Sequence, residues 1–442
     1  MSAHISTSIQ SWGRVHRGSH HFVEPSWLSE VGPLSTDLSA ETGSVIAHGL
    51  GRSYGDSALN LDHGLVRTTR LDRILHFDRE AGILRAEAGA SLDDLLKVIV
   101  PTGWFLPVTP GTKFVTLGGA VPNDVHGKNH HQVGTFGCHV QRLALWRSDR
   151  GIIECSTTEN DELFKATIGG LGLTGIILWV EIKLTGIPSA YLEVENERFQ
   201  GLDGFFDLSD RSKGWDYTVA WVDTIAKGRK LGRGVFSRGR FSGAGVLEAH
   251  DDGGPTFPIE APSFALNRIS VGAFNALYYH KPSSSYRGLQ HYDPFFYPLD
   301  RLKRWNRLYG RRGFYQWQCA VPKPDQKQIV EELLKLISAS GQASFLAVLK
   351  TFGDTTSPGL LSFPMEGATL ALDFPNRGEQ TLALLTQLDR VVETGKGRLY
   401  PAKDGRLPAR LFKLNYPGWE EVERMRDPVL MSSFWRRILS ED

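Results

Sequence analysis

Glycine-rich segments constrain the fold of this chain more than any other feature of its sequence. They read GLGRSYGD from residue 49, VTLGGAVPNDVHGKNHHQVGTFG from residue 115 and GGLGLTGII from residue 169. Closely spaced glycines let successive backbone N–H groups point into one concavity, which binds anions such as phosphates. The simpler alternative for each segment is a glycine turn between two strands, and the first motif alone does not decide between them.

Two of these segments match known functional motifs, but the secondary structure that each motif requires is not predicted next to them. Residues 170–175 fit G-x-G-x-x-G, but a dinucleotide fingerprint needs a helix after it, and the β-branched residues 176–184 predict a strand. Residues 51–55 fit G-x-S-x-G, but a nucleophile elbow also needs a helix directly after Ser53, and residues 56–64 do not supply one. We therefore expect neither a Rossmann site nor a serine hydrolase.

Composition excludes further classes of protein. The 50 Lys and Arg residues balance 49 Asp and Glu residues, so the chain lacks the basic field of a nucleic-acid binder. The longest apolar-leaning run without charge spans 15 residues, 166–180, whereas a membrane-spanning helix needs about 20. No signal-peptide core is visible near residue 1. With Cys138, Cys155 and Cys319 widely spaced, we expect a protein of a reducing compartment, cytoplasmic or peripheral at a membrane.

Periodicity predicts two structural units. In the first, strands over residues 43–50 and 82–88 precede a helix capped by Ser91, with Asp94 at the capping-box spacing. In the second, strands over 315–322, 345–350, 369–374 and 398–401 alternate with helices over 325–338 and 379–394, the latter closed by Gly395 at C′. This β-α-β-β-α-β order predicts an antiparallel sheet with helices on one face. Residues 259–293, rich in aromatics and weakly periodic, predict either a mobile flap over a site or an exposed loop.

Polar residues crowd the second glycine segment. His126, His130 and His131 invite a metal site, but Gly127 and Asn129 argue against the helix that would align them, so we expect no metal. A polar cluster lining a ligand site is the better interpretation.

These motifs, together with GRLYPAKD from residue 397, resemble flavin oxidases of vanillyl-alcohol-oxidase type, and most closely the decaprenylphosphoryl-β-D-ribose 2′-oxidase family. The resemblance implies an α+β fold, with a two-subdomain FAD-binding domain of PCMH type and a substrate domain built on an antiparallel sheet with helices on one face. It implies an FAD-binding domain over residues 1–187, a substrate domain over 188–397 and a C-terminal return over 398–442.

The same resemblance implies a set of site residues. FAD would be bound by Gly49, Leu50, Gly51, Arg52, Ser53, Tyr54, Gly55, Gly111, Thr116, Leu117, Gly118, Gly119, Asn123, Asp124, Val125, His126, Ile176 and Tyr400. Relatives with covalent flavin carry a histidine where this chain has Arg52, so we expect noncovalent FAD. Lys403, with His126 and Lys128, would serve catalysis, and Tyr297, Gln318 and Lys350 would bind substrate. Some family members have a cysteine where Ala371 stands here.

The implied reaction is oxidation of the C2 hydroxyl of a polyprenylphosphoryl-β-D-ribofuranose to a 2-keto sugar. A short-chain reductase partner would then complete an epimerisation to the arabinofuranose donor used for cell-wall arabinan. The aromatics of residues 259–293 would suit the prenyl chain or a bilayer surface, with Lys281 and Arg287 near phosphate. Two alternatives remain at this stage: an oxidase of free alditols or aldonolactones that uses oxygen, and a flavin-binding module without turnover.

Overall fold

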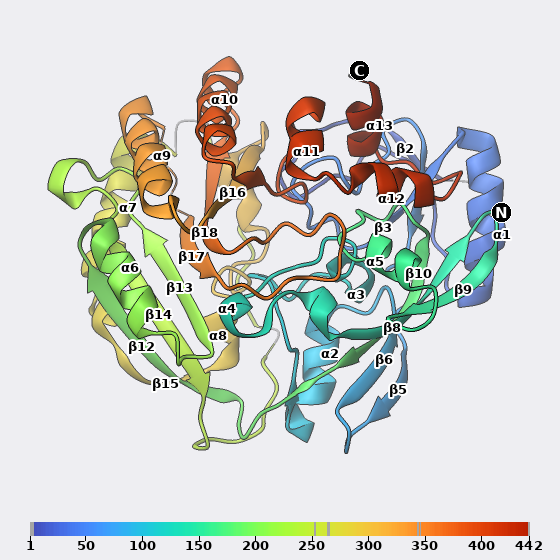
Figure 1. Ribbon diagram of the computed structural model, residues 1–442, viewed down its shortest axis with the longest axis horizontal. Helices are drawn as coiled ribbons and strands as arrows, with labels where there is room; N and C mark the ends of the chain where they lie inside the picture. Colours follow the sequence, from blue (N-terminus) through green and yellow to red (C-terminus); the bar gives the residue numbers. More distant parts are fainter. Residues whose placement is uncertain (1–3, 252, 263–265, 343, 345, 441–442) are drawn as a thin grey trace.

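Two sheets form the N-terminal lobe of the computed structural model, which describes residues 4–251, 253–262, 266–342, 344 and 346–440 (Figure 1). The smaller sheet has the order β1-β2-β4-β3 and consists of β1 (His4–Ser6), β2 (His20–Val23), β4 (Gly64–Arg67) and β3 (Val45–His48). The larger, antiparallel sheet has the order β5-β6-β10-β8-β9, from β5 (Ile74–Asp78), β6 (Ile83–Glu87), β10 (Ile176–Lys183), β8 (Val140–Arg147) and β9 (Gly151–Ser156). The short strands β7 (Trp104–Phe105) and β11 (Thr185–Gly186) pair beside it.

Short helices cover these sheets and connect them. They are α1 (Leu28–Thr42), α2 (Leu92–Ile99), α3 (Leu117–Ala120), α4 (His130–Val133) and α5 (Asp161–Thr167). The predicted cap of α2 is present, because the Ser91 hydroxyl accepts the Asp94 backbone N–H at 3.1 Å. The leucines of α2 are buried against the larger sheet, as its apolar spacing predicts.

The second lobe is one antiparallel sheet of eight strands. Its order is β15 (Arg287–His291), β12 (Tyr191–Phe199), β14 (Gly234–Phe241), β13 (Tyr217–Val222), β17 (Ala347–Phe352), β18 (Gly367–Pro375), β16 (Phe314–Pro322) and β19 (Arg398–Leu399). The helices α6 (Gly201–Arg211), α9 (Gln326–Ser340) and α10 (Glu379–Thr394) pack along one face of it (Figure 1). The predicted α+β class and the one-sided helices are therefore confirmed.

The last helices return to the N-terminal lobe. They are α11 (Ala409–Asn415), α12 (Trp419–Met425) and α13 (Ser433–Ser440). The Ser433 N–H donates to the Leu59 carbonyl at 2.7 Å, and Arg437 pairs with Asp56 at 3.1 Å. Strand β19 pairs with β16, so the sheet continues just past residue 397. The two predicted boundaries, after residues 187 and 397, remain predictions.

Two local expectations differ from the structure. Residues 259–293 include the helix α7 (Arg268–His280), the edge strand β15 and the start of the helix α8 (Tyr292–Phe296), secondary structure that the weak periodicity did not predict. Residues 263–265 lie outside the described residues, and the mobile flap stays a prediction. Gly395 ends α10 with φ −78°, and the left-handed residue is Lys396 at φ 54°. In the strand expected over 345–350, residue 345 lies outside the described residues.

Candidate active site

A cavity of about 900 Å³ lies between the glycine segments of the N-terminal lobe and the face of the eight-stranded sheet that is opposite α6, α9 and α10. Gly49, Gly119, Gly175 and Lys403 all line it, so the four motifs of the sequence converge on one space. Its volume lies within the range of about 300–1,000 Å³ that is usual for ligand and cofactor sites.

Most of the predicted cofactor residues line this cavity. They are Gly49, Leu50, Gly51, Arg52, Ser53, Tyr54, Gly111, Thr116, Gly118, Gly119, Asn123, Val125, His126 and Tyr400. The first loop leaves β3 at His48, and Gly51 adopts φ 63°, a left-handed conformation that favours glycine. The loop is held against the GRLYPAKD segment, where the Tyr54 N–H donates to the Ala402 carbonyl at 3.0 Å.

Two observations test whether this wall fits a bulky anionic cofactor. A Cβ added at Gly111 would meet no described atom within 4 Å, so this glycine faces open space. The Arg52 guanidinium stacks 4.0 Å from the centroid of the Trp12 ring, and its Nε is buried without a hydrogen-bond partner among the described residues. Guanidinium groups bind phosphate well. The wall therefore offers both room and an unsatisfied donor for a diphosphate-bearing group.

The remaining predicted cofactor residues support the wall from behind. They are Gly55, Leu117, Asp124 and Ile176. A Cβ at Gly55 would lie 1.9 Å from the Asp404 carbonyl oxygen, so this glycine allows two loops to pack. Asp124 is buried and accepts hydrogen bonds from Ser357 and Ser362, each at 2.5 Å. On β10 it is Ile177 whose side chain lines the cavity, because neighbouring strand residues point to opposite faces.

The sheet forms the opposite wall by the same alternation. On β16, Gln316 and Gln318 line the cavity, while Trp317 between them packs in the core under the helices. On β18, the cavity-facing residues are Thr369, Ala371 and Asp373. Lys350 projects into the cavity from β17, the strand on the other side of β18. Ala371, the position at which the resemblance implies a cysteine in some family members, thus faces the cavity.

His126 connects the two walls. Lys350 Nζ donates to His126 Nδ1 at 3.0 Å and to the Gly127 carbonyl at 3.0 Å. The Gln318 side-chain amide lies 3.1 Å from His126 Nε2. Burial, then the nearby Lys350 charge, hold the pKa of His126 well below its usual value. The ring is therefore neutral, with Lys350 Nζ beside one ring nitrogen and Gln318 Nε2 beside the other.

Three of the lysines that line this cavity are deeply buried and have a lowered pKa. Burial lowers the pKa of Lys350 to about 7, and of Lys128 and Lys403 to about 8. Lys128 Nζ donates to the Phe296 carbonyl at 3.0 Å, and Lys403 Nζ lies 4.3 Å from the centroid of the Tyr54 ring. Burial also raises the pKa of Asp373 to about 7.

Asp373 and Gln316 line the cavity but were not predicted from the sequence. Gln316 Nε2 donates to Asp373 Oδ1 at 2.6 Å, across the β16–β18 pair. Each residue lies two positions from one that was singled out, Gln318 or Ala371, and strand alternation alone places it on the same face.

Tyr297, predicted to bind substrate, is fully buried and does not line the cavity. Its hydroxyl shares a hydrogen bond of 2.6 Å with Thr109.

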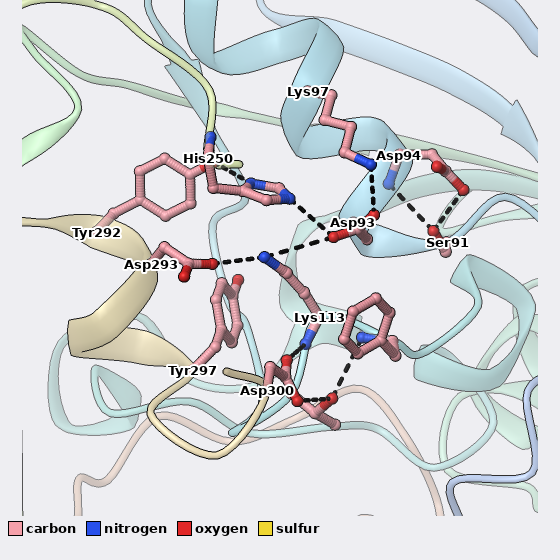
Figure 2. A network of polar contacts seen from close by, with 12 residues as sticks. Ser91, Asp93, Asp94, Lys97, Lys113, His250, Tyr292, Asp293, Tyr297 and Asp300 are labelled. Atoms are coloured by element: carbon pink, nitrogen blue, oxygen red, sulfur yellow. Dashed lines mark hydrogen bonds and ion pairs between the residues drawn. The ribbon is translucent and has the colours of Figure 1, made fainter. Parts of the chain in front are cut away.

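A buried ionic network holds one side of the cavity together (Figure 2). Lys113 Nζ contacts Asp293 at 2.5 Å and Asp93 at 3.5 Å, which joins the second lobe to α2 of the first. His250 Nε2 lies 2.8 Å from Asp93 Oδ1. The neighbouring Asp300, which lines the cavity, accepts the Lys113 backbone N–H at 2.8 Å. The network fixes the loop that carries Gly111.

Comparisons with known proteins agree with this geometry. The decaprenylphosphoryl-β-D-ribose oxidase of Mycolicibacterium smegmatis is 38% identical over 451 aligned residues, covering 97% of each chain. The chain belongs to the decaprenylphosphoryl-β-D-ribose oxidase family. The model of an FAD binding domain matches residues 20–156. This member of the family is therefore an FAD-dependent oxidoreductase, and the glycine-lined wall fits that cofactor.

Other relatives of this family member are more distant. An uncharacterized Streptomyces coelicolor protein from the mprA 5′ region is 31% identical over 79% of this chain and 98% of its own length. The L-gulonolactone oxidase of Scyliorhinus torazame is 32% identical over only 37% of this chain and 36% of its own. Among the described residues, no helix is long and apolar enough to span a membrane, and no cluster of His, Cys, Asp and Glu has the makings of a metal site.

The lowered pKa of Lys350 predicts a pH-dependent stability difference. Between pH 7 and the usual lysine value of about 10.4, the unfolded chain holds a proton that the folded chain releases, so this residue destabilises the fold less as pH rises. We expect FAD-free Lys350→Met protein to exceed the wild type in unfolding free energy, by a margin that shrinks by about 1–3 kcal/mol from about pH 7 to pH 9. Urea unfolding at both pH values measures this margin. Lys335→Met, on the exposed face of α9, is the control, and a margin independent of pH would contradict the prediction.

Proposed function

We propose that the substrate is a polyprenylphosphoryl-β-D-ribofuranose and that the enzyme oxidises its C2 hydroxyl to a ketone. The observation that carries this proposal is the meeting of Lys403, His126 and Gln318 in one cavity, where the glycine-lined wall and the sheet come together. The name of the Mycolicibacterium smegmatis relative supports the sugar and its lipid phosphate.

When bound, FAD supplies the acceptor for the hydride that leaves C2. The protein must orient the sugar and manage charge and protons. In our proposal the Lys403 ammonium faces the reacting centre, where a fixed cation stabilises developing negative charge without reorganisation. His126, Gln318 and Lys350 bind the sugar hydroxyls from the sheet side, and Lys128 holds the neighbouring wall.

The hydroxyl proton also needs an acceptor with a pKa near neutrality. Lys350 and Asp373 both have a pKa of about 7 and line the cavity. Either group can therefore take up this proton at neutral pH. The neutral His126 ring is hydrogen-bonded to Lys350.

Anaerobic mixing of the holoenzyme with a prenylphosphoryl ribose tests the proposal. We expect the flavin absorbance to bleach and one 2-keto sugar to form per flavin, while free alditols and aldonolactones leave the flavin oxidised. Bleaching with the free sugars alone, followed by peroxide formation once oxygen is admitted, would favour the alditol or aldonolactone oxidase instead. No bleaching with any of them would favour a flavin-binding module without turnover.

We also propose that FAD is bound without a covalent link. Arg52 stands in the first glycine loop where relatives with covalent flavin carry a histidine, and a guanidinium forms no such bond. Acid precipitation should therefore release all of the yellow colour into the supernatant. Colour that stays in the protein pellet, after washing, would contradict this prediction.

The product implies a partner. A 2-keto sugar needs a reductase to complete an epimerisation, and we propose a short-chain reductase partner on the basis of the family resemblance. We further propose that the protein works in the cytoplasm or at a membrane surface, where a lipid-linked sugar is accessible.

A further inference from the structure

The helix α7 presents an apolar face to water. Ile269 is 84% exposed, Leu277 73% and Phe274 41%. Its buried residues include the polar Asn275 and Tyr279. A surface helix ordinarily buries its apolar stripe and exposes its polar one. The exposed stripe of α7, defined by Ile269, Ala273, Ala276 and Leu277, is therefore unexplained by the packing of the chain.

Positively charged residues lie on α7 and on a neighbouring loop. Residues 266–292 contain no Asp or Glu, and Arg268 begins the helix. The loop that joins β13 to β14 carries Lys227, Arg229 and Lys230, all exposed.

That basic loop lies beside α7. Asn275 Nδ2 donates to Asp223 Oδ1 at 2.8 Å, and a Cβ at Gly272 would lie 3.9 Å from Ile225. The carboxylate of Asp223 is buried and paired with Arg233 at 2.7 Å, so it does not offset the exposed cations. An apolar stripe bordered by cations has the chemistry that binds an anionic lipid surface.

The same helix reaches the active-site cavity. Phe274 and Tyr278 line the cavity, and Phe274 is also exposed, so the cavity opens to solvent beside the stripe. Lys281 lines the cavity as well, with Nζ 3.8 Å from the centroid of the Tyr278 ring. A lipid tail leaving a bilayer at α7 would meet aromatic side chains and a cation on its way in.

We propose that α7 docks the protein on an anionic phospholipid bilayer, with the exposed stripe inserted and the cations of the β13–β14 loop against the headgroups. The inference rests on the proposed function, since a lipid-linked substrate gives the docking its use. The bilayer is favoured over a protein partner because exposed cations lie on the neighbouring loop, α7 itself carries no Asp or Glu, and the same helix lines the cavity.

Flotation of the full-length holoprotein with vesicles tests this surface. Vesicles of equal parts phosphatidylcholine and phosphatidylglycerol should bind the protein, more weakly at high salt, and phosphatidylcholine alone should bind it less. Ile269→Glu/Leu277→Glu should lower the partition coefficient at least about tenfold. Lys227→Glu/Arg229→Glu/Lys230→Glu should also lower it at least about tenfold. Ile152→Glu, at a 64% exposed apolar residue of β9, is the matched control and should bind as the wild type does.

The proposal is overturned if the wild type does not bind anionic vesicles, or if Ile269→Glu/Leu277→Glu binds them equally well. It is also overturned if that variant keeps vesicle binding but loses a purified short-chain reductase, which would make the stripe a protein interface. Flavin reduction by detergent-solubilised prenylphosphoryl ribose separates the two proposals. The flavin of Ile269→Glu/Leu277→Glu should be reduced at the wild-type rate. If this substrate does not reduce the flavin of the wild type, the proposed function is overturned, but the vesicle result still stands.

Discussion

Replacing Lys403 with methionine is expected to slow flavin reduction by the sugar about 10²–10³-fold while leaving FAD bound. The expected loss follows from the position of this cation. Its ammonium lies in the cavity where all four motifs meet, and its pKa of about 8 keeps it mainly protonated at neutral pH. Methionine keeps the length and removes the charge. Stopped-flow absorbance of the holoenzyme under anaerobic conditions measures the rate.

Lys335→Met is the control for this substitution, because Lys335 lies on the outer surface of α9, where its partner is Glu331. The sugar should reduce the flavin of this variant at the wild-type rate. If the rate of flavin reduction is unchanged in Lys403→Met, this lysine takes no part in the chemistry, but the proposed cofactor site is unaffected. Loss of FAD together with activity would instead make Lys403 a cofactor-binding residue.

Replacing Gly111 with valine is expected to weaken FAD binding about tenfold to a hundredfold without destabilising the FAD-free protein. The site has room, since a Cβ there meets no described atom within 4 Å, and its backbone is outside the left-handed region. Only a bound group would collide with the new side chain, and such overpacking costs about 1–3 kcal/mol. Fluorescence titration of the FAD-free protein gives the affinity, and urea unfolding gives the stability.

Gly214→Val is the matched control, because Gly214 is also without neighbours within 4 Å but is exposed and remote from the cavity lining. It should change neither quantity. Gly55→Ala should behave in the opposite way and destabilise the FAD-free fold, since its Cβ would strike the Asp404 carbonyl. Full FAD affinity in Gly111→Val would show that the cofactor does not pass this glycine.

The motifs and the strand periodicity predicted much of this architecture. The cap at Ser91 and the strand-and-helix order around β16 to β19 follow from local sequence, because propensity and packing agree there. At the site, the motifs do not tell which face of a strand each side chain occupies. The resemblance pointed to Ile176, but the side chain that faces the cavity is that of Ile177. Asp373 was missed because a carboxylate on a buried strand carries no motif, and only its neighbours across the sheet explain it.

The helix α7 was missed for a different reason. Apolar residues lie on both its buried and its exposed sides, so the sequence shows no clean helical period. A signal was present at its start, where Asn267 Oδ1 accepts the N–H groups of Ile269 and Ser270. Such capping is local and readable. The same exposed apolar residues that obscure the helical period also suggest that α7 contacts a membrane.

The central claim is that the glycine-lined wall holds FAD with its ring facing Lys403. A crystal structure of the protein with bound FAD measures this directly. The account predicts the diphosphate along residues 49–55, the coenzyme passing Gly111, and the flavin ring beside the Lys403 ammonium and His126. A flavin bound elsewhere, or bound here with its ring directed away from Lys403, would contradict it.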